Sequence, residues 1–270
     1  MNWTAVMYKI AVAIVKECLE SIMRWTNKLI SFKLLKNDEI KIIKDLKKYG
    51  LHIEKGFLPK HRCDELISII DKLILSESAN VWRDETDSDK RIYFVNEIDS
   101  HMTEFYENKK IRAILNGYTG SNNPVGMLLA ARIDHKTNNQ GSGGGWHRDS
   151  PYTHQFKAVC YLSDVDEDNG PFQYIKKSHS KYIILKNYIN KIFTPGQYRF
   201  TNEEIERYLR FSNQEVQTVC GSQGTIVYTD TKGIHRGKPL ASGSRYVLFC
   251  YFWNNKIPEH FAKLKQDVEK

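Results

Sequence analysis

The pattern of apolar residues changes near Pro124, and this change limits the folds open to the chain. Before it, apolar residues recur at helical spacing, most clearly in residues 38–49, 59–74 and 102–118. After it, short runs rich in Val, Ile, Tyr and Phe alternate with Asp, Asn, Gly and Ser, which is typical of strands and turns. The expected strands are residues 125–134, 157–162, 172–175, 217–220, 225–228 and 246–253. Helices followed by strands predict an α+β protein whose N-terminal helices wrap a β-barrel or β-sandwich core.

A long insert interrupts the strand pattern at residues 181–213. It is rich in Lys, Tyr and Asn and contains a helical stretch at residues 202–209. Inserts of this length in a compact β core more often form a lid or a binding element than a passive connection. We therefore expect the insert to contribute to substrate selection.

The first 48 residues are predicted to be helical. We expect a helical extension at residues 1–48 and one domain at residues 49–270. An amphipathic helix is predicted near the start, because the following apolar residues share one face: Trp3, Met7, Ile14, Cys18, Ile22, Trp25 and Leu29. The apolar run at residues 10–15 is too short to span a bilayer, and no signal-peptide cleavage pattern follows it. Packing on its own domain or on a partner subunit is expected, with membrane-surface contact as the minor alternative.

Charge and cysteine content narrow the class of protein. The net charge of +8 favours anionic partners, although a lysine-rich soluble surface explains it equally well. The lysines are spread along the chain without aromatic–basic clusters, so no nucleic-acid partner is expected. The five cysteines are widely spaced and form no CxxC pair. This argues against a disulfide framework or a structural zinc site and favours a reducing compartment, so a cytoplasmic location is expected.

The chemistry-bearing residues begin with His147 and Asp149, which follow the glycine-rich residues 141–145. In an extended segment their spacing points both side chains to the same face. A distant histidine, His235, would complete a set of two imidazoles and one carboxylate, which suits non-haem Fe(II) and leaves coordination positions open. Arg245 follows ten residues later, and an arginine there can bind a carboxylate through two parallel hydrogen bonds. The pattern predicts a metal site for oxidative chemistry.

Residues 141–145 are not a phosphate-binding loop, because they lack the strand–helix context and the spacing of one. A flexible approach to the strand that carries His147 is the better interpretation.

The ordered set of motifs resembles the phytanoyl-CoA dioxygenases, which are Fe(II)- and 2-oxoglutarate-dependent oxygenases. The resemblance is strongest over residues 126–253. It rests on His147-x-Asp149, residues 159–164 running to residues 169–171, Ser178-His179, His235 and Arg245. The resemblance implies a double-stranded β-helix, a jelly-roll or cupin-like core flanked by the N-terminal helices. It also implies that His147, Asp149 and His235 hold Fe(II) and that Arg245 binds the distal carboxylate of 2-oxoglutarate.

The activity that the resemblance implies is hydroxylation of a small molecule by O2, with release of succinate and CO2. The presence of Asp149 favours hydroxylation, because related halogenases have a small residue at this position. Anionic, lipid-linked and sugar-linked substrates all stay open. Two alternatives also stay open: a desaturase or epimerase variant of the same chemistry, and a non-catalytic binding module on the same fold. The sequence gives no prediction of the oligomeric state.

One position departs from the family pattern. A serine that often assists with the co-substrate two residues after the distal histidine is replaced here by Gly237. A second carboxylate ligand must then come from elsewhere, and Arg91, Arg132 and Lys157 are the candidates.

Overall fold

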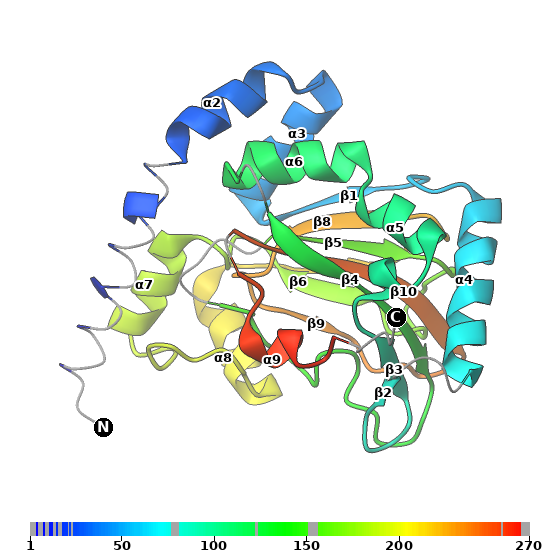
Figure 1. Cartoon of the computed structure of the whole chain (residues 1–270). Helices are drawn as coiled ribbons and strands as arrows, with labels where there is room; N and C mark the ends of the chain where they lie inside the picture. The colour runs from blue at the N-terminus through cyan, green and yellow to red at the C-terminus, as the bar shows by residue number, and fades with distance from the viewer. Residues whose placement is uncertain are drawn as a thin grey trace.

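The computed structural model describes residues 24–76, 81–121, 124–150, 156–254 and 256–265, together with positions 4, 8, 11, 12, 15, 18–20 and 22. Within these residues, ten strands form two sheets, a larger one of seven strands and a smaller one of three, and all their strand pairs are antiparallel. The larger sheet has the order β1-β8-β5-β10-β4-β3-β2 and the smaller one the order β7-β6-β9. Figure 1 shows helices packed on the larger sheet and the smaller sheet lying below it.

The larger sheet is built around its longest pair, β4 and β10. Its strands are β1 (Leu51–Glu54), β2 (Trp82–Arg83), β3 (Asp89–Ile92), β4 (Val125–Asp134), β5 (Phe156–Tyr161), β8 (Ile226–Asp230) and β10 (Ser244–Trp253). The register of β4 and β10 runs without interruption from Ser244 opposite Asp134 to Trp253 opposite Val125. Successive side chains along a strand point to opposite faces of the sheet. The register therefore decides which side chains of β4 and β10 share a face.

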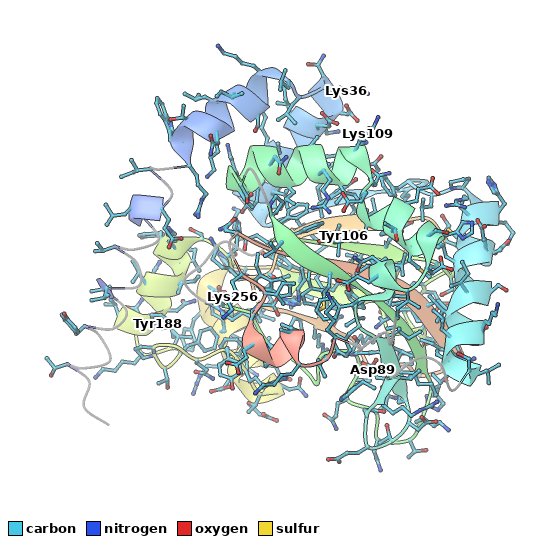
Figure 2. The ribbon with its side chains drawn as sticks, in the orientation of Figure 1. Lys36, Asp89, Tyr106, Lys109, Tyr188 and Lys256 are labelled. Atoms are coloured by element: carbon cyan, nitrogen blue, oxygen red, sulfur yellow. The ribbon has the colours of Figure 1, made fainter. Side chains whose placement is uncertain are left out.

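One face of the larger sheet packs against helices. The even-numbered side chains of β4 and β10, such as Leu128 and Cys250, share a buried cluster with α3 (Asn37–Tyr49), α4 (Lys60–Leu75), α5 (Ser100–Tyr106) and α6 (Lys109–Thr119). Tyr106, labelled in Figure 2, stacks on Phe252 with ring centroids 5.3 Å apart. This cluster buries the amphipathic faces of the helices, which is what stabilises them.

The other face of the larger sheet turns toward the smaller sheet. Its odd-numbered side chains, such as Val159 and Val247, form a second buried cluster with Phe172 and Tyr174 of the smaller sheet. The smaller sheet consists of β6 (Phe172–Ile175), β7 (Val216–Val219) and β9 (His235–Gly237). Two facing antiparallel sheets of this kind form a jelly-roll core, so the prediction of an α+β, jelly-roll fold is confirmed.

The insert folds back onto the smaller sheet. It contains α7 (Lys181–Ile189) and α8 (Asn202–Ser212), which share a third buried cluster with Trp146, Ile175 and Ile234. Helix α8 begins with a capping box, in which Thr201 accepts from the backbone of Glu204 and Glu204 accepts from the backbone of Thr201. The segment between the helices pairs with the His147 segment through an isolated bridge at Arg199, which extends the smaller sheet by two short segments.

Several boundaries differ from the sequence predictions. The helix predicted over residues 102–118 is two helices, α5 and α6, because the side chain of Asn108 caps a new helix start by accepting from Lys110 and Ile111. The polar loop predicted at residues 76–90 contains β2 and the start of β3. The division into an extension at residues 1–48 and a domain at residues 49–270 stays a prediction; residue 48 lies within α3, whose Ile43 and Leu46 are buried in the same cluster as the larger sheet.

The N-terminal helix prediction is only partly covered by the described residues. Trp3, Met7 and Ile14 lie outside them. Ile22 and Trp25 are exposed, and α2 (Trp25–Lys33) lies against α6. No helix in the described part of the chain has the length and apolar character needed to cross a membrane. The remaining elements are the short η1 (Val95–Glu97) and α9 (Glu259–Ala262).

Candidate metal centre

The two predicted histidine ligands lie directly opposite each other on neighbouring backbone segments. The backbone N–H of His147 donates to the carbonyl of His235 at 2.9 Å, and that of His235 donates to the carbonyl of His147 at 2.8 Å. Residues paired in this way in an antiparallel ladder carry their side chains on the same face. The two imidazole rings accordingly lie with centroids 4.3 Å apart, although 88 positions separate them in the sequence.

Asp149 joins this pair from the same segment as His147. Its backbone N–H donates to the carbonyl of Thr231 at 2.9 Å, which holds the end of the segment against the loop after β8. Its Oδ1 lies 3.9 Å from Nε2 of His147, and one ligand atom from each of the three side chains lies within 4.8 Å of the others. Donors about 2.0–2.2 Å from one metal ion are spaced in this way. The structure thus brings together His147, Asp149 and His235.

Each histidine is oriented by a hydrogen bond from its other ring nitrogen. Nδ1 of His147 lies 2.9 Å from the carbonyl oxygen of Gly145, and Nδ1 of His235 lies 2.9 Å from that of Gly233. A carbonyl oxygen only accepts, so Nδ1 carries the proton in both rings. Both Nε2 atoms keep a lone pair for a metal ion, as in metal sites where the second nitrogen fixes the tautomer.

The protonation states of the three side chains also suit a metal. Burial and the neighbouring imidazole lower the pKa of His235 to about 3, and burial lowers the pKa of His147 as well. Burial would raise the pKa of Asp149, but the positive charge of Lys157 and the two nearby histidines outweigh it, and the pKa falls below its ordinary value. Near pH 7 the site therefore offers two neutral imidazoles and a carboxylate, the forms that bind metal ions.

His147 and His235 line a cavity, and Lys157 lines it too and holds the carboxylate of Asp149. Its Nζ is 2.6 Å from Oδ2 of Asp149 and 3.9 Å from the ring centroid of Tyr251. Burial would lower the pKa of this lysine, yet Asp149 and Tyr251 raise it above its ordinary value, so the ammonium stays charged. Lys157 is thus placed to fix one oxygen of Asp149 and leave the other toward the histidines.

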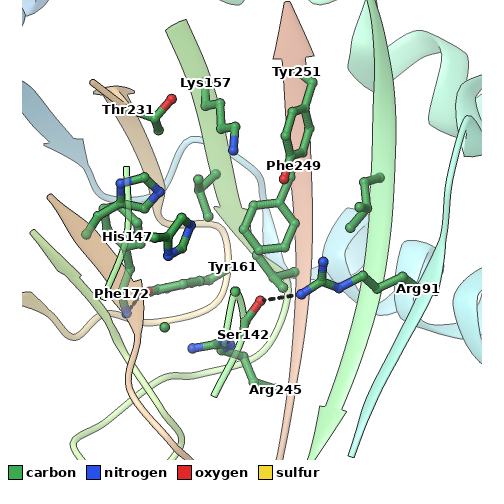
Figure 3. Close-up of a pocket in the computed structure, with 16 residues that line it drawn as sticks. Arg91, Ser142, His147, Lys157, Tyr161, Phe172, Thr231, Arg245, Phe249 and Tyr251 are labelled. Carbon is green, nitrogen blue, oxygen red and sulfur yellow. Dashed lines mark hydrogen bonds between the residues drawn. The ribbon is translucent and has the colours of Figure 1, made fainter. Parts of the chain in front are cut away.

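Arg245 lies at the other end of the cavity, as Figure 3 shows. It is only 2% exposed, and burial lowers the pKa of its guanidinium. Within the described residues its Nε has no hydrogen-bond partner and no carboxylate lies within ion-pair distance. A buried cation without an anion is costly. The position therefore suits an anionic group brought by a ligand.

The other two candidate cations differ in position. Arg91 lines the cavity, but its charge is balanced by Asp89, with Nε–Oδ1 and Nη2–Oδ2 distances of 2.9 and 2.6 Å. Arg132 does not line it. It lies opposite Tyr246 in the ladder, on the helix-covered face, and pairs with Asp71 at 3.0 Å.

The prediction that Arg132 binds the co-substrate is therefore corrected. Arg245 lies opposite Ile133, so the pleat points Arg132 to the opposite face of the sheet.

The cavity also contains residues that the sequence analysis did not single out. Val247, Phe249 and Tyr251 follow Arg245 at intervals of two, and the two aromatic residues line the cavity together with Tyr161 and Phe172. Phe249 and Tyr251 can be predicted from Arg245, because every second residue of a strand lies on the same face. Ser142 and Thr231 lie on irregular segments, where no periodicity predicts them.

The chain is similar in fold to solved structures that include two enzymes of nogalamycin biosynthesis and HygX. The epimerase SnoN from nogalamycin biosynthesis, in a complex with Fe3+, α-ketoglutarate and nogalamycin RO, has a TM-score of 0.63 and 14% identity over 86% of this chain and 91% of its own. The carbocyclase SnoK of the same biosynthesis has a TM-score of 0.58 and 12% identity over 86% and 91%. HygX from Streptomyces hygroscopicus, with nickel, 2-oxoglutarate and hygromycin B bound, has a TM-score of 0.58 and 12% identity over 83% and 90%.

At these identities the likeness is one of fold. No curated protein matches the sequence. The sequence profile of the phytanoyl-CoA dioxygenase family, in contrast, matches residues 46–246. The matched region contains the His147–Asp149 pair, His235 and Arg245, and it spans most of the chain. The chain belongs to the phytanoyl-CoA dioxygenase family.

Proposed function

We propose that this chain is an Fe(II)- and 2-oxoglutarate-dependent oxygenase that hydroxylates a small molecule. One observation carries the proposal: two neutral imidazoles, with a carboxylate beside them, line the same cavity as a buried arginine that has no ion-pair partner among the described residues. A metal ion and a dicarboxylate would satisfy both features at once. Family membership and the cofactors of SnoN and HygX support this choice of metal and co-substrate.

In this proposal each side chain has one task. Nε2 of His147, Nε2 of His235 and a carboxylate oxygen of Asp149 hold the metal ion. Lys157 keeps Asp149 oriented through its 2.6 Å ion pair. Arg245 binds the distal carboxylate of 2-oxoglutarate through charge-assisted hydrogen bonds. Arg91 is not assigned the second contact to this carboxylate, because its guanidinium is already paired with Asp89.

When bound, the metal ion and 2-oxoglutarate would supply oxidation by O2, in which one oxygen atom goes to succinate as 2-oxoglutarate loses CO2 and the other goes to the hydroxylated substrate. The larger sheet lines the cavity with side chains that exclude water from the reacting groups. These are Leu129, Val159, Val247, Phe249 and Tyr251. Asp149 occupies the position at which a halide would need room, which favours hydroxylation over halogenation. SnoN and SnoK are an epimerase and a carbocyclase on this fold, so epimerisation is the variant outcome to compare with hydroxylation.

The substrate is proposed to be a small molecule. SnoN and HygX bind nogalamycin RO and hygromycin B at this fold, which supports a small-molecule substrate as a class. The basic balance of the chain, +8, favours an anionic one.

The test is an anaerobic titration of the metal-free protein with Fe(II) and then 2-oxoglutarate. We expect a visible absorbance band when the 2-oxo acid binds beside Fe(II) in the wild type, and no band in His235→Ala. A folded wild-type protein that gives no band would overturn the proposed function. A band of equal strength in His235→Ala would show that metal and co-substrate bind somewhere else.

A further inference from the structure

The glycine-rich loop of residues 141–145 packs closely against the imidazole of His147. Four of its five residues are glycines with positive φ, between 65° and 90°. A Cβ on Gly143 would lie 2.4 Å from Cε1 of His147, and a Cβ on Gly141 would lie 2.2 Å from the carbonyl oxygen of Gly237. Only residues without a side chain fit this close approach. The loop is therefore part of the wall of the site, rather than only a connection to the strand that carries His147.

A glycine-rich segment loses more conformational entropy on ordering than any other, so it needs contacts that hold it in place. One such contact comes from the insert between α7 and α8. Nη1 of Arg199 donates to the carbonyl of Gly143 at 2.8 Å and to that of Gly144 at 3.0 Å. A guanidinium thus binds two consecutive loop carbonyls from a segment 55 residues away.

The backbone on either side of Arg199 strengthens this attachment. The carbonyl of Tyr198 accepts from Arg148 at 2.8 Å, and the backbone N–H of Phe200 donates to Trp146 at 3.0 Å. The insert therefore forms a short ladder with the segment that carries His147, and Arg199 reaches from this ladder to the loop. The same ladder fixes both the insert and the metal ligand.

The loop presents one side chain to the cavity, that of Ser142. It is 8% exposed, and its Oγ accepts from Nη2 of Arg91 at 3.4 Å. A Cβ built on Gly237 would lie 2.9 Å from Cβ of Ser142 and 3.0 Å from Nη2 of Arg245, so Ser142 and Arg245 meet at the space that Gly237 leaves open. Figure 3 shows Ser142 between Arg91 and Arg245.

We propose that Arg199 is a positioning residue for co-substrate binding: it holds the glycine-rich loop closed so that the Ser142 hydroxyl donates to the same carboxylate that Arg245 binds. A hydroxyl accepts from one group and donates to another at the same time, so Ser142 keeps its contact with Arg91. This inference rests on the proposed function, since it assigns the second contact of the 2-oxoglutarate carboxylate.

The first experiment compares dissociation constants for 2-oxoglutarate in anaerobic Fe(II)-loaded wild type, Arg199→Gln, Ser142→Ala and the double variant. We expect each single change to raise the constant about tenfold, the loss of roughly one charge-assisted hydrogen bond. The double variant should be weakened far less than the product of the two, because both residues act through one contact. The Fe(II) affinity of Ser142→Ala should stay at the wild-type value. Arg210→Gln is the matched control, an exposed arginine of the same insert that pairs only with Glu206 in the described structure.

The second experiment needs no metal or co-substrate. Hydrogen–deuterium exchange of peptides covering residues 141–147 should be faster in Arg199→Gln than in wild type and unchanged in Arg210→Gln. Arg199→Lys, which keeps a cationic donor, should restore slow exchange in part.

The outcomes separate the two proposals. Wild type that binds no 2-oxoglutarate overturns the proposed function. Wild type that binds it, with Arg199→Gln and Ser142→Ala binding equally well, overturns the positioning role alone. Weaker binding in Arg199→Gln with unchanged loop exchange also contradicts it, because the residue would then act without holding the loop.

Discussion

The two sheets of the core contribute to the site in different ways. The larger sheet carries Arg245 and Lys157 on long strands, with an uninterrupted ladder of ten residue pairs between β4 and β10. The smaller sheet and its extension carry the proposed metal ligands on a strand of three residues and on single bridges at His147. In the proposed function, co-substrate recognition would rest on a long ladder, whereas the metal centre would depend on short segments that pair with one another. Each prediction below breaks one side of this comparison and leaves the other intact.

The largest effect is expected from removing a metal ligand on the smaller sheet. His235→Ala should weaken Fe(II) binding by more than about 100-fold, the upper end of what even indirect partners of metal ligands contribute. The fold should persist, because the larger sheet and its helices do not depend on this imidazole. Metal content and far-UV circular dichroism measure the two effects. His101→Ala is the control, since this histidine is 43% exposed and lies near Glu65; equal metal loss in both variants would contradict the assignment.

A substitution of Lys157 on the larger sheet should lower the free energy of unfolding of the metal-free protein. Lys157→Met leaves Asp149 without its ion pair, and the metal-free protein should lose about 1–2 kcal/mol, less than for a fully buried pair because Asp149 is 23% exposed. An added metal ion replaces the missing positive charge. Fe(II) added without oxygen should therefore raise Tm more in the variant than in wild type. Equal rises in Tm would show that Lys157 does not support Asp149.

Gly237 lies where the two sheets meet at Arg245. Gly237→Ser places a Cβ 3.0 Å from Nη2 of Arg245 and 2.9 Å from Cβ of Ser142, so one of them must move. The affinity for 2-oxoglutarate should fall about tenfold, as for one displaced hydrogen bond, with Fe(II) affinity unchanged. Gly237→Ala adds the same Cβ without a hydroxyl and should lower the affinity to a similar extent. An unchanged affinity in both variants would show that Arg245 and Ser142 do not need to move.

The smallest effect is expected in the insert. Thr201→Ala removes the cap of α8 and should lower the free energy of unfolding by about 1 kcal/mol. Since the backbone of residues 198–200 still pairs with the His147 segment, Fe(II) affinity should not change. Urea denaturation and a metal titration on the same samples check both statements. A loss of metal affinity would mean that the metal segment depends on α8 itself.

The same contrast explains how far the sequence predicted the structure. The bounds of β4 and β6 agree with the prediction, because a proline precedes each apolar run, Pro124 before β4 and Pro171 before β6. Strand β9 was not predicted, since His235–Gly237 has no alternation and forms only because it lies beside β6 and His147. The break between α5 and α6 was missed because the apolar spacing continues through Asn108, and its cap overrides that spacing.

The candidate site shows the same limit. Residue type and spacing selected His147, Asp149, His235 and Arg245, and the structure brings all four to one cavity or its edge. Their roles stay predictions until the binding experiments are done. Arg132 was selected by charge alone, and only the strand register shows that it faces the opposite side from Arg245. Arg199 was not singled out at all, because its partners are carbonyls 55 residues away.

The most direct test of the account is a comparison of two arginines that face opposite sides of one sheet. The dissociation constant for 2-oxoglutarate is measured by anaerobic titration of Fe(II)-loaded wild type, Arg245→Gln and Arg132→Gln. We predict a rise of about 100-fold for Arg245→Gln, from the loss of a bidentate charge-assisted contact, and less than about twofold for Arg132→Gln. Equal constants for Arg245→Gln and wild type, or a larger effect of Arg132→Gln, would contradict the placement of the co-substrate on the larger sheet.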